Sequence, residues 1–139
     1  MSFGTILLPL FVQVLLMFVL LFWLADLRRS AVKRGELRFQ DAAIGNPWTG
    51  RVAQVGNAFR NQFELPVLFF VVVILAMFTR KADFLFLVLE WIFVALRIAH
   101  AAIHTGPNVV RVRGPVWGLG ALVLLIMWIW FAAHIYVGF

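Results

Sequence analysis

The chain has 139 residues, of which 64% are hydrophobic and 13% are charged, and it contains no cysteine. A soluble domain has about 45–50% apolar and about 25% charged residues, so lipid must cover part of this surface. The absence of cysteine excludes disulfides, thiolate metal sites and cysteine nucleophiles. The basic residues behind the net charge of +6 cluster between apolar runs. This pattern favours membrane topology and anionic lipid headgroups, and we expect no nucleic acid partner.

Four apolar runs predict an all-α integral membrane protein, a four-transmembrane-helix bundle that forms one domain over residues 1–139. A helix needs about 20 apolar residues to cross the hydrocarbon layer. The second run is short by itself, but the residues before it are compatible with a helix that extends it. We expect the spans at roughly residues 5–25, 55–79, 84–104 and 116–137.

The first run is expected to remain in the protein as a span. The residues before it carry no positive charge, the run is too long for a signal peptide, and Arg28 and Arg29 follow it directly. In the long connection that comes next, Trp48 is an aromatic residue able to sit at the level of the lipid headgroups.

Basic residues at the span ends predict the orientation. The first connection carries six of them and the third adds two, whereas the second has two beside an aspartate. The positive-inside rule then puts the first and third connections in the cytoplasm and both termini outside. We expect a multi-pass protein of a bacterial inner membrane.

Charged and amide side chains interrupt the second span. Inside a membrane such groups are expensive and usually face a bundle interior or a cavity. At about 100° per residue, four of them fall within one stripe: Asn57, Arg60, Asn61 and Glu64. Arg60 and Glu64, one turn apart, could form an ion pair. Pro66 lacks an N–H, so we predict a kink beside it.

The third span carries a second polar cluster. Glu90, Arg97 and His104 recur every seven residues and lie on nearly one face, with His100 at its edge. The two histidines have metal-ligand spacing, but a metal site usually takes three or more protein ligands and no third histidine or cysteine is close. We therefore expect no metal.

Two interpretations of these clusters stay open. In the structural one, Glu64 and Glu90 neutralise Arg60 and Arg97 and hold helices together inside the bundle. In the functional one, the surplus of arginine faces a cytoplasmic cavity and binds an anionic ligand, because the guanidinium fork grips carboxylates bidentately.

The segment from Arg60 to Pro66 resembles the second-helix motif of the MAPEG superfamily, membrane-associated proteins in eicosanoid and glutathione metabolism. The segment from Leu96 to His100 resembles the Arg-x-x-His motif of the family's third helix. Arg113 lies at the separation from that histidine where microsomal prostaglandin E synthase has a catalytically important arginine. The motifs are nearest to those of that enzyme and of microsomal glutathione transferase.

This resemblance implies a homotrimer of four-helix bundles. It implies glutathione as a cosubstrate, bound between subunits with its thiol aimed at a lipophilic substrate from the membrane. Arg113 is the implied catalytic residue, since it would lower the thiol pKa from ~8.5 and raise the thiolate fraction. The residues implied to bind glutathione are Arg28, Arg60, Asn61, Glu64, Arg97, His100 and His104.

Four positions depart from the family pattern. Asn57 stands where many members have an arginine, and His104 stands where a tyrosine often contacts glutathione. Gly114 stands where the prostaglandin synthase has a serine, and Trp117 replaces a nearby tyrosine. Two functions stay open. One is a glutathione-dependent transferase or peroxidase that conjugates or reduces lipophilic electrophiles by thiolate attack. The other is a non-catalytic, trimeric lipid-binding or accessory membrane protein. The sequence names neither the substrate nor the physiological thiol.

Overall fold

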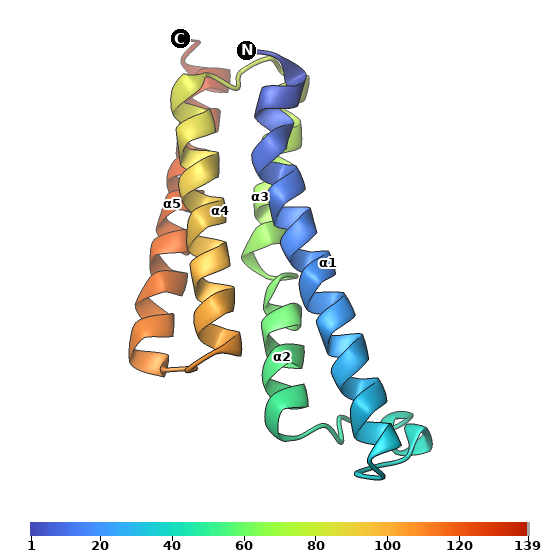
Figure 1. Ribbon diagram of the computed structural model, residues 1–139. Coiled ribbons are helices and arrows are strands. Elements are labelled where there is room, and N and C mark those ends of the chain that lie inside the picture. Colours follow the sequence, from blue (N-terminus) through green and yellow to red (C-terminus); the bar gives the residue numbers. More distant parts are fainter. Residues whose placement is uncertain (139) are drawn as a thin grey trace.

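The computed structural model describes residues 1–138, and its helices run side by side as an elongated bundle (Figure 1). A short 3₁₀ helix, η1, lies in the connection between α1 and α2. The helix bounds are α1 Phe3–Lys33, η1 Phe39–Ala42, α2 Gly50–Asn61, α3 Leu65–Phe78, α4 Phe84–Thr105 and α5 Val110–Tyr136. The expected all-α, four-helix membrane bundle is confirmed.

Four helical stretches are long and apolar enough to cross a membrane. They are Phe3–Lys33, Gly50–Phe78, Phe84–Thr105 and Val110–Tyr136. The shortest has 22 residues, which at about 1.5 Å each gives about 33 Å, enough for a hydrocarbon core of about 30 Å. The chain is therefore a multi-pass integral membrane protein.

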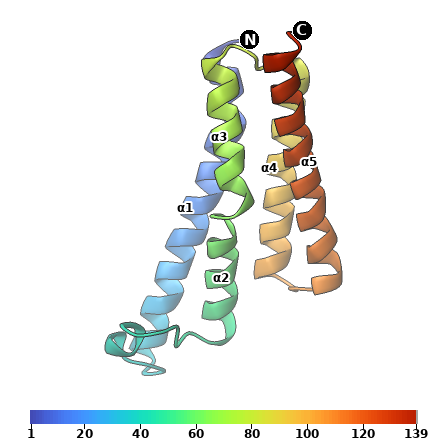
Figure 2. The same cartoon turned by 180° about the vertical axis from the view of Figure 1, so that it is seen from behind.

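Both termini lie at one end of the bundle, and the first and third connections lie at the other (Figures 1 and 2). The two connections thus share a side of the membrane, and which side that is stays a prediction. Phe139, predicted to lie outside the cell, falls outside the described residues. One expectation was wrong: α5 begins at Val110, so Arg111 and Arg113 lie in its first turns and not in the third connection.

The second span is broken. α2 ends at Asn61 and α3 begins at Leu65, and Glu64 between them has φ −93° and ψ −104°, outside the helical region. Pro66 lies at the start of α3, where its missing N–H is tolerated but cannot continue the hydrogen bonds of α2. The kink predicted beside Pro66 is present as a full interruption.

Two buried glutamines fill the interruption. Gln13 of α1 donates from Nε2 to Oε1 of Gln62 at 2.8 Å, and Gln62 donates to the carbonyl of Ala58 at 3.2 Å. Both side chains are fully buried. Broken helices persist in membranes where neighbouring side chains satisfy the freed backbone groups. The interruption is therefore stabilised by side chains of the bundle, and it sets the direction in which the neighbouring side chains point.

The apolar core lies mainly among α1, α3, α4 and α5. Phe69 of α3 stacks on Phe93 of α4 with ring centroids 4.6 Å apart, at the centre of the largest buried cluster. A smaller cluster around Leu24 and Val55 joins α1 to α2 nearer the first connection. This packing holds α2 and α4 in the relative position that the polar residues between them require.

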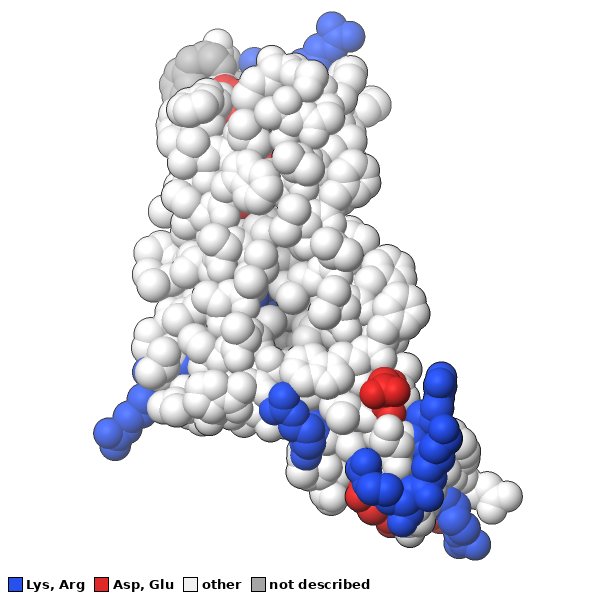
Figure 3. Space-filling model, in the orientation of Figure 1, with Lys and Arg blue, Asp and Glu red and all other residues white. Residues whose placement is uncertain are grey.

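The surface matches a membrane setting. On the face in Figure 3, Lys and Arg gather at the end that carries the first connection, and a broad belt above it holds almost no charge. Large apolar side chains point outward along the spans, for example Phe22 and Phe78. Lipid therefore contacts most of this belt.

Candidate functional site

A polar pocket of about 470 Å³ lies between α2 and the adjoining ends of α4 and α5. Its lining is Asn57, Arg60, Asn61, Glu64, His104 and Arg113. Five of the eight predicted site residues therefore meet in one pocket, from helices that are far apart in the sequence. Asn57 was treated only as a departure from the family pattern, although its place on the polar stripe of α2 was a signal for it.

The hydrogen bonds on the α2 side differ from the predicted ion pair. The Arg60 guanidinium donates to Oδ1 of Asn57, and Asn61 donates from Nδ2 to Oε2 of Glu64 at 2.9 Å. Within residues 1–138 there is no Arg60–Glu64 ion pair, so that expectation was wrong. The reason is the break: α2 ends at Asn61, and the spacing of one helical turn no longer holds at Glu64.

Arg97 of α4 lies next to Asn61, on the buried side of the residues that line the pocket. It is 1% exposed, and its Nη2 donates to Oδ1 of Asn61. Its Nε and Nη1 have no hydrogen-bond partner in the described part of the chain. Arg97 therefore orients the Asn61 amide and keeps unused donors close to the pocket.

Glu90 is isolated. It is fully buried, and neither carboxylate oxygen has a hydrogen-bond partner among residues 1–138. Among the described residues no ion pair joins Glu64 or Glu90 to Arg60 or Arg97, so the structural interpretation stays a prediction without a direct pairing in the single chain. Seven residues separate Glu90 from Arg97, which is about 10 Å along a helix. Glu90 and Arg97 therefore lie on nearly the same face of α4 without forming an ion pair with each other among the described residues.

The two histidines of α4 lie edge to face, with ring centroids 5.6 Å apart. His104 lines the pocket, whereas His100 is buried next to it. The Nδ1 atoms of both have no hydrogen-bond partner in the described residues. In the same part of the chain no group of three His, Cys, Asp or Glu residues is arranged to hold a metal.

Arg113 reaches the pocket from α5. Its Nη1 donates to Oδ1 of Asn108 at 2.6 Å, and Asn108 has φ +53° in the turn between α4 and α5. Asparagine tolerates this left-handed conformation better than most residues. Arg111 is exposed and does not line the pocket. Both arginines add charge to the positive end of the α5 dipole, so this end of the helix favours anions.

Side chains near the start of α2 donate hydrogen bonds to backbone carbonyls at the end of α4. Gln54 donates from Nε2 to the carbonyls of His104, at 2.8 Å, and Gly106, at 3.0 Å. Arg51 donates to the carbonyl of Thr105. These side chains satisfy carbonyls that a helix end leaves without partners. Neither Arg51 nor Gln54 was predicted to contact the end of α4. The signal available in the sequence was a pair of polar residues, three positions apart, just before an apolar run.

Arg28 lies in a neighbouring pocket of about 430 Å³. Arg60 lines both pockets, and the second one also contains Asn46 and Trp48. The Arg28 guanidinium lies over the Trp48 ring, 5.1 Å from its centroid. Of the residues with which Arg28 was predicted to act, the described chain brings only Arg60 into the same pocket.

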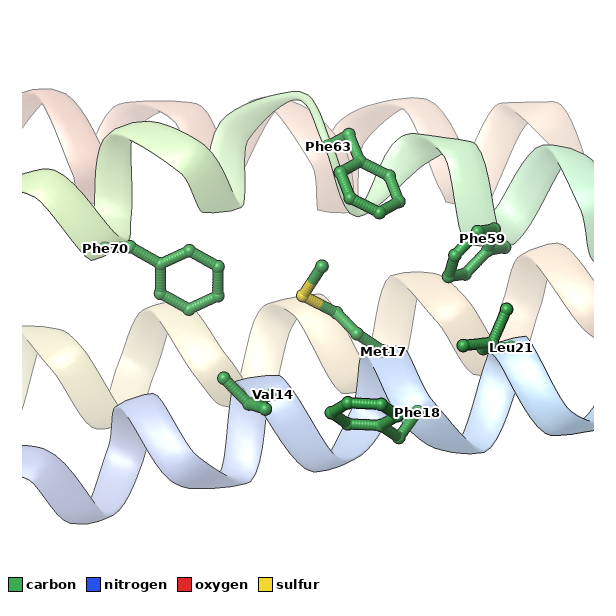
Figure 4. A pocket seen from close by; sticks show the side chains of 7 residues that line it. All are labelled: Val14, Met17, Phe18, Leu21, Phe59, Phe63 and Phe70. Atoms are coloured by element: carbon green, nitrogen blue, oxygen red, sulfur yellow. The ribbon is translucent and has the colours of Figure 1, made fainter.

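An apolar pocket of about 240 Å³ lies between α1 and the broken span (Figure 4). Its lining is Val14, Met17, Phe18, Leu21, Phe59, Phe63 and Phe70. Phe59 and Phe63 meet edge to face with centroids 5.2 Å apart. Residues 59–64 therefore present aromatic rings to one pocket and polar groups to another.

Four membrane-spanning helices, with a polar pocket whose lining includes two arginines, define a polytopic membrane protein with a candidate site for an anionic ligand. A model of the MAPEG family matches residues 6–133, so the chain belongs to this family of membrane proteins in glutathione and eicosanoid metabolism. No curated protein and no solved structure matches the chain.

Proposed function

We propose that this protein is a glutathione-dependent transferase or peroxidase that acts on lipophilic electrophiles. The supporting observation is the pocket of about 470 Å³ lined by two arginines, a glutamate and two asparagines. Glutathione carries carboxylates, an ammonium group, amides and a thiol, and each finds a complementary group there. Guanidinium groups bind carboxylates with two parallel hydrogen bonds, and Glu64 can accept from the ammonium group.

The proposed roles follow from these contacts. Arg60 holds a glutathione carboxylate, and Asn61, oriented by Arg97, bonds the peptide. His104 contributes a further polar contact from α4, and His100 positions its ring. Arg28 is left out of this set because it lines the neighbouring pocket.

The chemistry is attack by the glutathione sulfur. A thiol with a pKa of ~8.5 is mostly protonated at neutral pH, and a nearby guanidinium favours the thiolate. We assign this role to Arg113. In a transfer reaction the sulfur bonds to an electrophilic carbon while a leaving group departs or a ring opens. In peroxide reduction the thiolate attacks one peroxide oxygen, the O–O bond breaks, and the other oxygen leaves and is protonated to an alcohol. The resulting sulfenic acid then reacts with a second glutathione to give the disulfide and water.

We propose a homotrimer as the working form. Asn57, Arg60 and Glu64 are exposed in the single chain, although Glu64 lies halfway between Gly50 and Phe78 in the second span. Charged groups at such a depth are costly unless protein or water covers them. A neighbouring copy against α2 would cover them and close the pocket. Cross-linking in native membranes should yield trimers, and a stable, folded monomer would count against this assembly.

The decisive test of function is thermal unfolding of the detergent-solubilised protein with and without millimolar glutathione. A ligand that binds only the folded state raises the unfolding temperature as its concentration rises above Kd. We expect such a rise, together with a glutathione conjugate or oxidised glutathione when lipophilic electrophiles or peroxides are added. The control is S-methylglutathione, whose sulfur is blocked as a thioether, and it should bind but form no product.

A second candidate is a non-catalytic lipid-binding or accessory trimer. It is favoured by the Arg60–Asn57 hydrogen bond, which occupies a guanidinium that the enzyme hypothesis assigns to glutathione. In that case glutathione would give no thermal protection, and the trimer would form nonetheless. That pair of results would reject the enzyme and retain the accessory role.

A further inference from the structure

Two side chains of α2 cap the end of α4 beside the polar pocket. Gln54 donates to the carbonyls of His104 and Gly106, and Arg51 donates to the carbonyl of Thr105 between them. These are consecutive carbonyls at the end of a helix, where no later turn of α4 supplies N–H donors. We call these hydrogen bonds the α4 cap. The cap joins helices whose residues lie 50 or more positions apart in the chain.

Arg51 is itself held in place by two neighbours. Its guanidinium lies over the ring of Trp23 on α1, 4.9 Å from the centroid, and its Nη1 donates to Oε1 of Gln54 at 3.5 Å. Stacking on an aromatic ring fixes the plane of a guanidinium and leaves its edge N–H groups free to donate. The donors of the α4 cap therefore contact each other and are supported by α1.

The α4 cap lies on one side of the pocket residues of α2, and a second link to α4 lies on the other. α2 and α4 run in opposite directions (Figure 1), so Gln54 meets the end of α4. Asn61, about two turns later, accepts from Arg97, which comes earlier in α4. Asn57 and Arg60 lie between these two links. Both links are contacts within one chain and need no neighbouring copy.

The α4 and α5 residues of the pocket depend on the α4 cap. His104 lines the pocket, and its own carbonyl is one of those that Gln54 binds. Arg113 donates from Nη1 to Oδ1 of Asn108 at 2.6 Å, and Asn108 lies in the turn that follows Gly106. Gln54 thus holds the segment from which both side chains reach the pocket.

We propose that Gln54 is a positioning residue of the glutathione site, which keeps Arg113 where it stabilises the thiolate of bound glutathione. This inference rests on the proposed function. Gln54 does not line the pocket, and it acts through the backbone of the turn between α4 and α5. An amide donates without carrying a charge, so Gln54 fixes the turn without attracting the anionic ligand itself.

The test uses Gln54→Met, which keeps the length of the side chain and removes its N–H donors. Gln40→Met is the matched control, because Gln40 is an exposed glutamine of η1 outside the α4 cap. Each full-length protein is reconstituted in lipid nanodiscs and titrated with glutathione, and the thiolate absorbance gives both the Kd and the pKa of the bound thiol. Turnover is measured with chlorodinitrobenzene as a model electrophile.

We expect Gln54→Met to raise the pKa of the bound thiol and to lower turnover about tenfold to a hundredfold, because small displacements of a catalytic group are costly. The Kd should change by less than about threefold, since Arg60 and Glu64 on α2 stay in place. Gln40→Met should match the wild type. An unchanged thiol pKa in Gln54→Met, or equal effects of the two variants, would overturn the proposal.

A double variant separates positioning from a general loss of stability. If Gln54 acts through Arg113, Gln54→Met should not raise the thiol pKa any further in an Arg113→Gln background. The same increase with and without Arg113 would reject the positioning role. Gln54→Arg keeps N–H donors at this position and guards against a folding defect in Gln54→Met. It should retain turnover within about threefold of the wild type, and a loss as large as that in Gln54→Met would count against the proposal.

Amide hydrogen exchange without glutathione keeps this inference distinct from the proposed function. Residues 104–113 should exchange about tenfold faster in Gln54→Met and at the wild-type rate in Gln40→Met, because the α4 cap no longer holds the turn. Unchanged exchange in Gln54→Met would reject the positioning by Gln54, whatever the thiol does. Wild-type protein that binds no glutathione would instead reject the proposed function.

Discussion

At the scale of single residues, Asn61 joins polar clusters that belong to different spans. Its Oδ1 accepts from the Arg97 guanidinium and its Nδ2 donates to Oε2 of Glu64. An amide can accept on one side and donate on the other, whereas a carboxylate only accepts and an aliphatic side chain does neither. Asn61 therefore links the buried Arg97 guanidinium to the Glu64 carboxylate in the pocket by hydrogen bonds on both sides of its amide.

The role proposed for Arg113 predicts the effect of Arg113→Gln. Losing one charge-assisted contact to a carboxylate or thiolate should reduce glutathione affinity roughly tenfold to a hundredfold and raise the pKa of the bound thiol. Titration followed by the thiolate absorbance measures both. Arg111→Gln is the matched control, because Arg111 lies on the same end of α5 outside the pocket. Equal effects of the two variants would mean that only net charge matters.

The isolation of Glu90 predicts an unusual gain in stability. A buried polar group without a hydrogen bond destabilises a fold by about 1–3 kcal/mol on mutational scales. Glu90→Leu should therefore raise the unfolding temperature in detergent. Glu64→Leu, at a carboxylate that is exposed and bonded to Asn61, should bring no such gain. A marked loss of stability in Glu90→Leu would show that this carboxylate has a partner in the assembled protein.

At the scale of elements, the interruption between α2 and α3 decides how the second span works. It turns Glu64 into the pocket beside Asn61 while Phe63 remains on the apolar side. A continuous helix would place Glu64 one turn above Arg60 and favour the ion pair that is absent here. Because of the break, Arg60 and Glu64 do not form a salt bridge with each other, and both side chains line the pocket, where a ligand can contact them.

The hydrogen bond between the two glutamines predicts a measurable coupling. Gln13→Leu leaves Oε1 of Gln62 buried without its donor, which should destabilise the protein by about 1–3 kcal/mol. The double variant with Gln62→Leu should destabilise less than the sum of the single changes, because both partners are then removed. A double-mutant cycle of unfolding free energies measures the difference. Strictly additive effects, within about 0.5 kcal/mol, would mean that the pair does not support the break.

At the scale of the whole molecule, the polar residues concentrate toward one end. The pocket of about 470 Å³ and the Arg28 pocket both lie toward the end with the first and third connections. If the proposed function holds, a thiol from the aqueous phase and a lipophilic substrate from the membrane would meet at this boundary. The side of the membrane that this end faces would then decide which aqueous compartment supplies the proposed thiol.

The orientation predicts the labelling of introduced cysteines. The natural chain has none, so single cysteines at Arg34 and Ala82 report only their own positions. With the first connection in the cytoplasm, position 82 should react with a membrane-impermeant reagent in intact cells and position 34 only after lysis. Labelling of position 34 from outside would reverse the predicted orientation and, with it, the compartment expected to supply the proposed thiol.

The membrane fold and most of the residues that line the pocket could be predicted from the order of the amino acids. Apolar runs must match the thickness of the bilayer, so their number and length indicate the spans. The helical period places Asn57, Arg60 and Asn61 on one stripe, and the cost of burying charge in lipid directs that stripe to protein or water. The lengths of the apolar runs and the helical period can both be read along the chain, and each has a direct physical cause.

Which of these polar groups contact each other depends on how the helices pack in three dimensions. Spacing suggested that Arg60 pairs with Glu64 and Glu90 with Arg97, but the break and the length of two helical turns prevent both contacts. The family resemblance grouped Arg28 with the glutathione site, and in the single chain Arg28 lies in an adjoining pocket that Arg60 also lines. Side-chain partners depend on the distances between helices, and those distances follow from packing that no periodicity along the chain records.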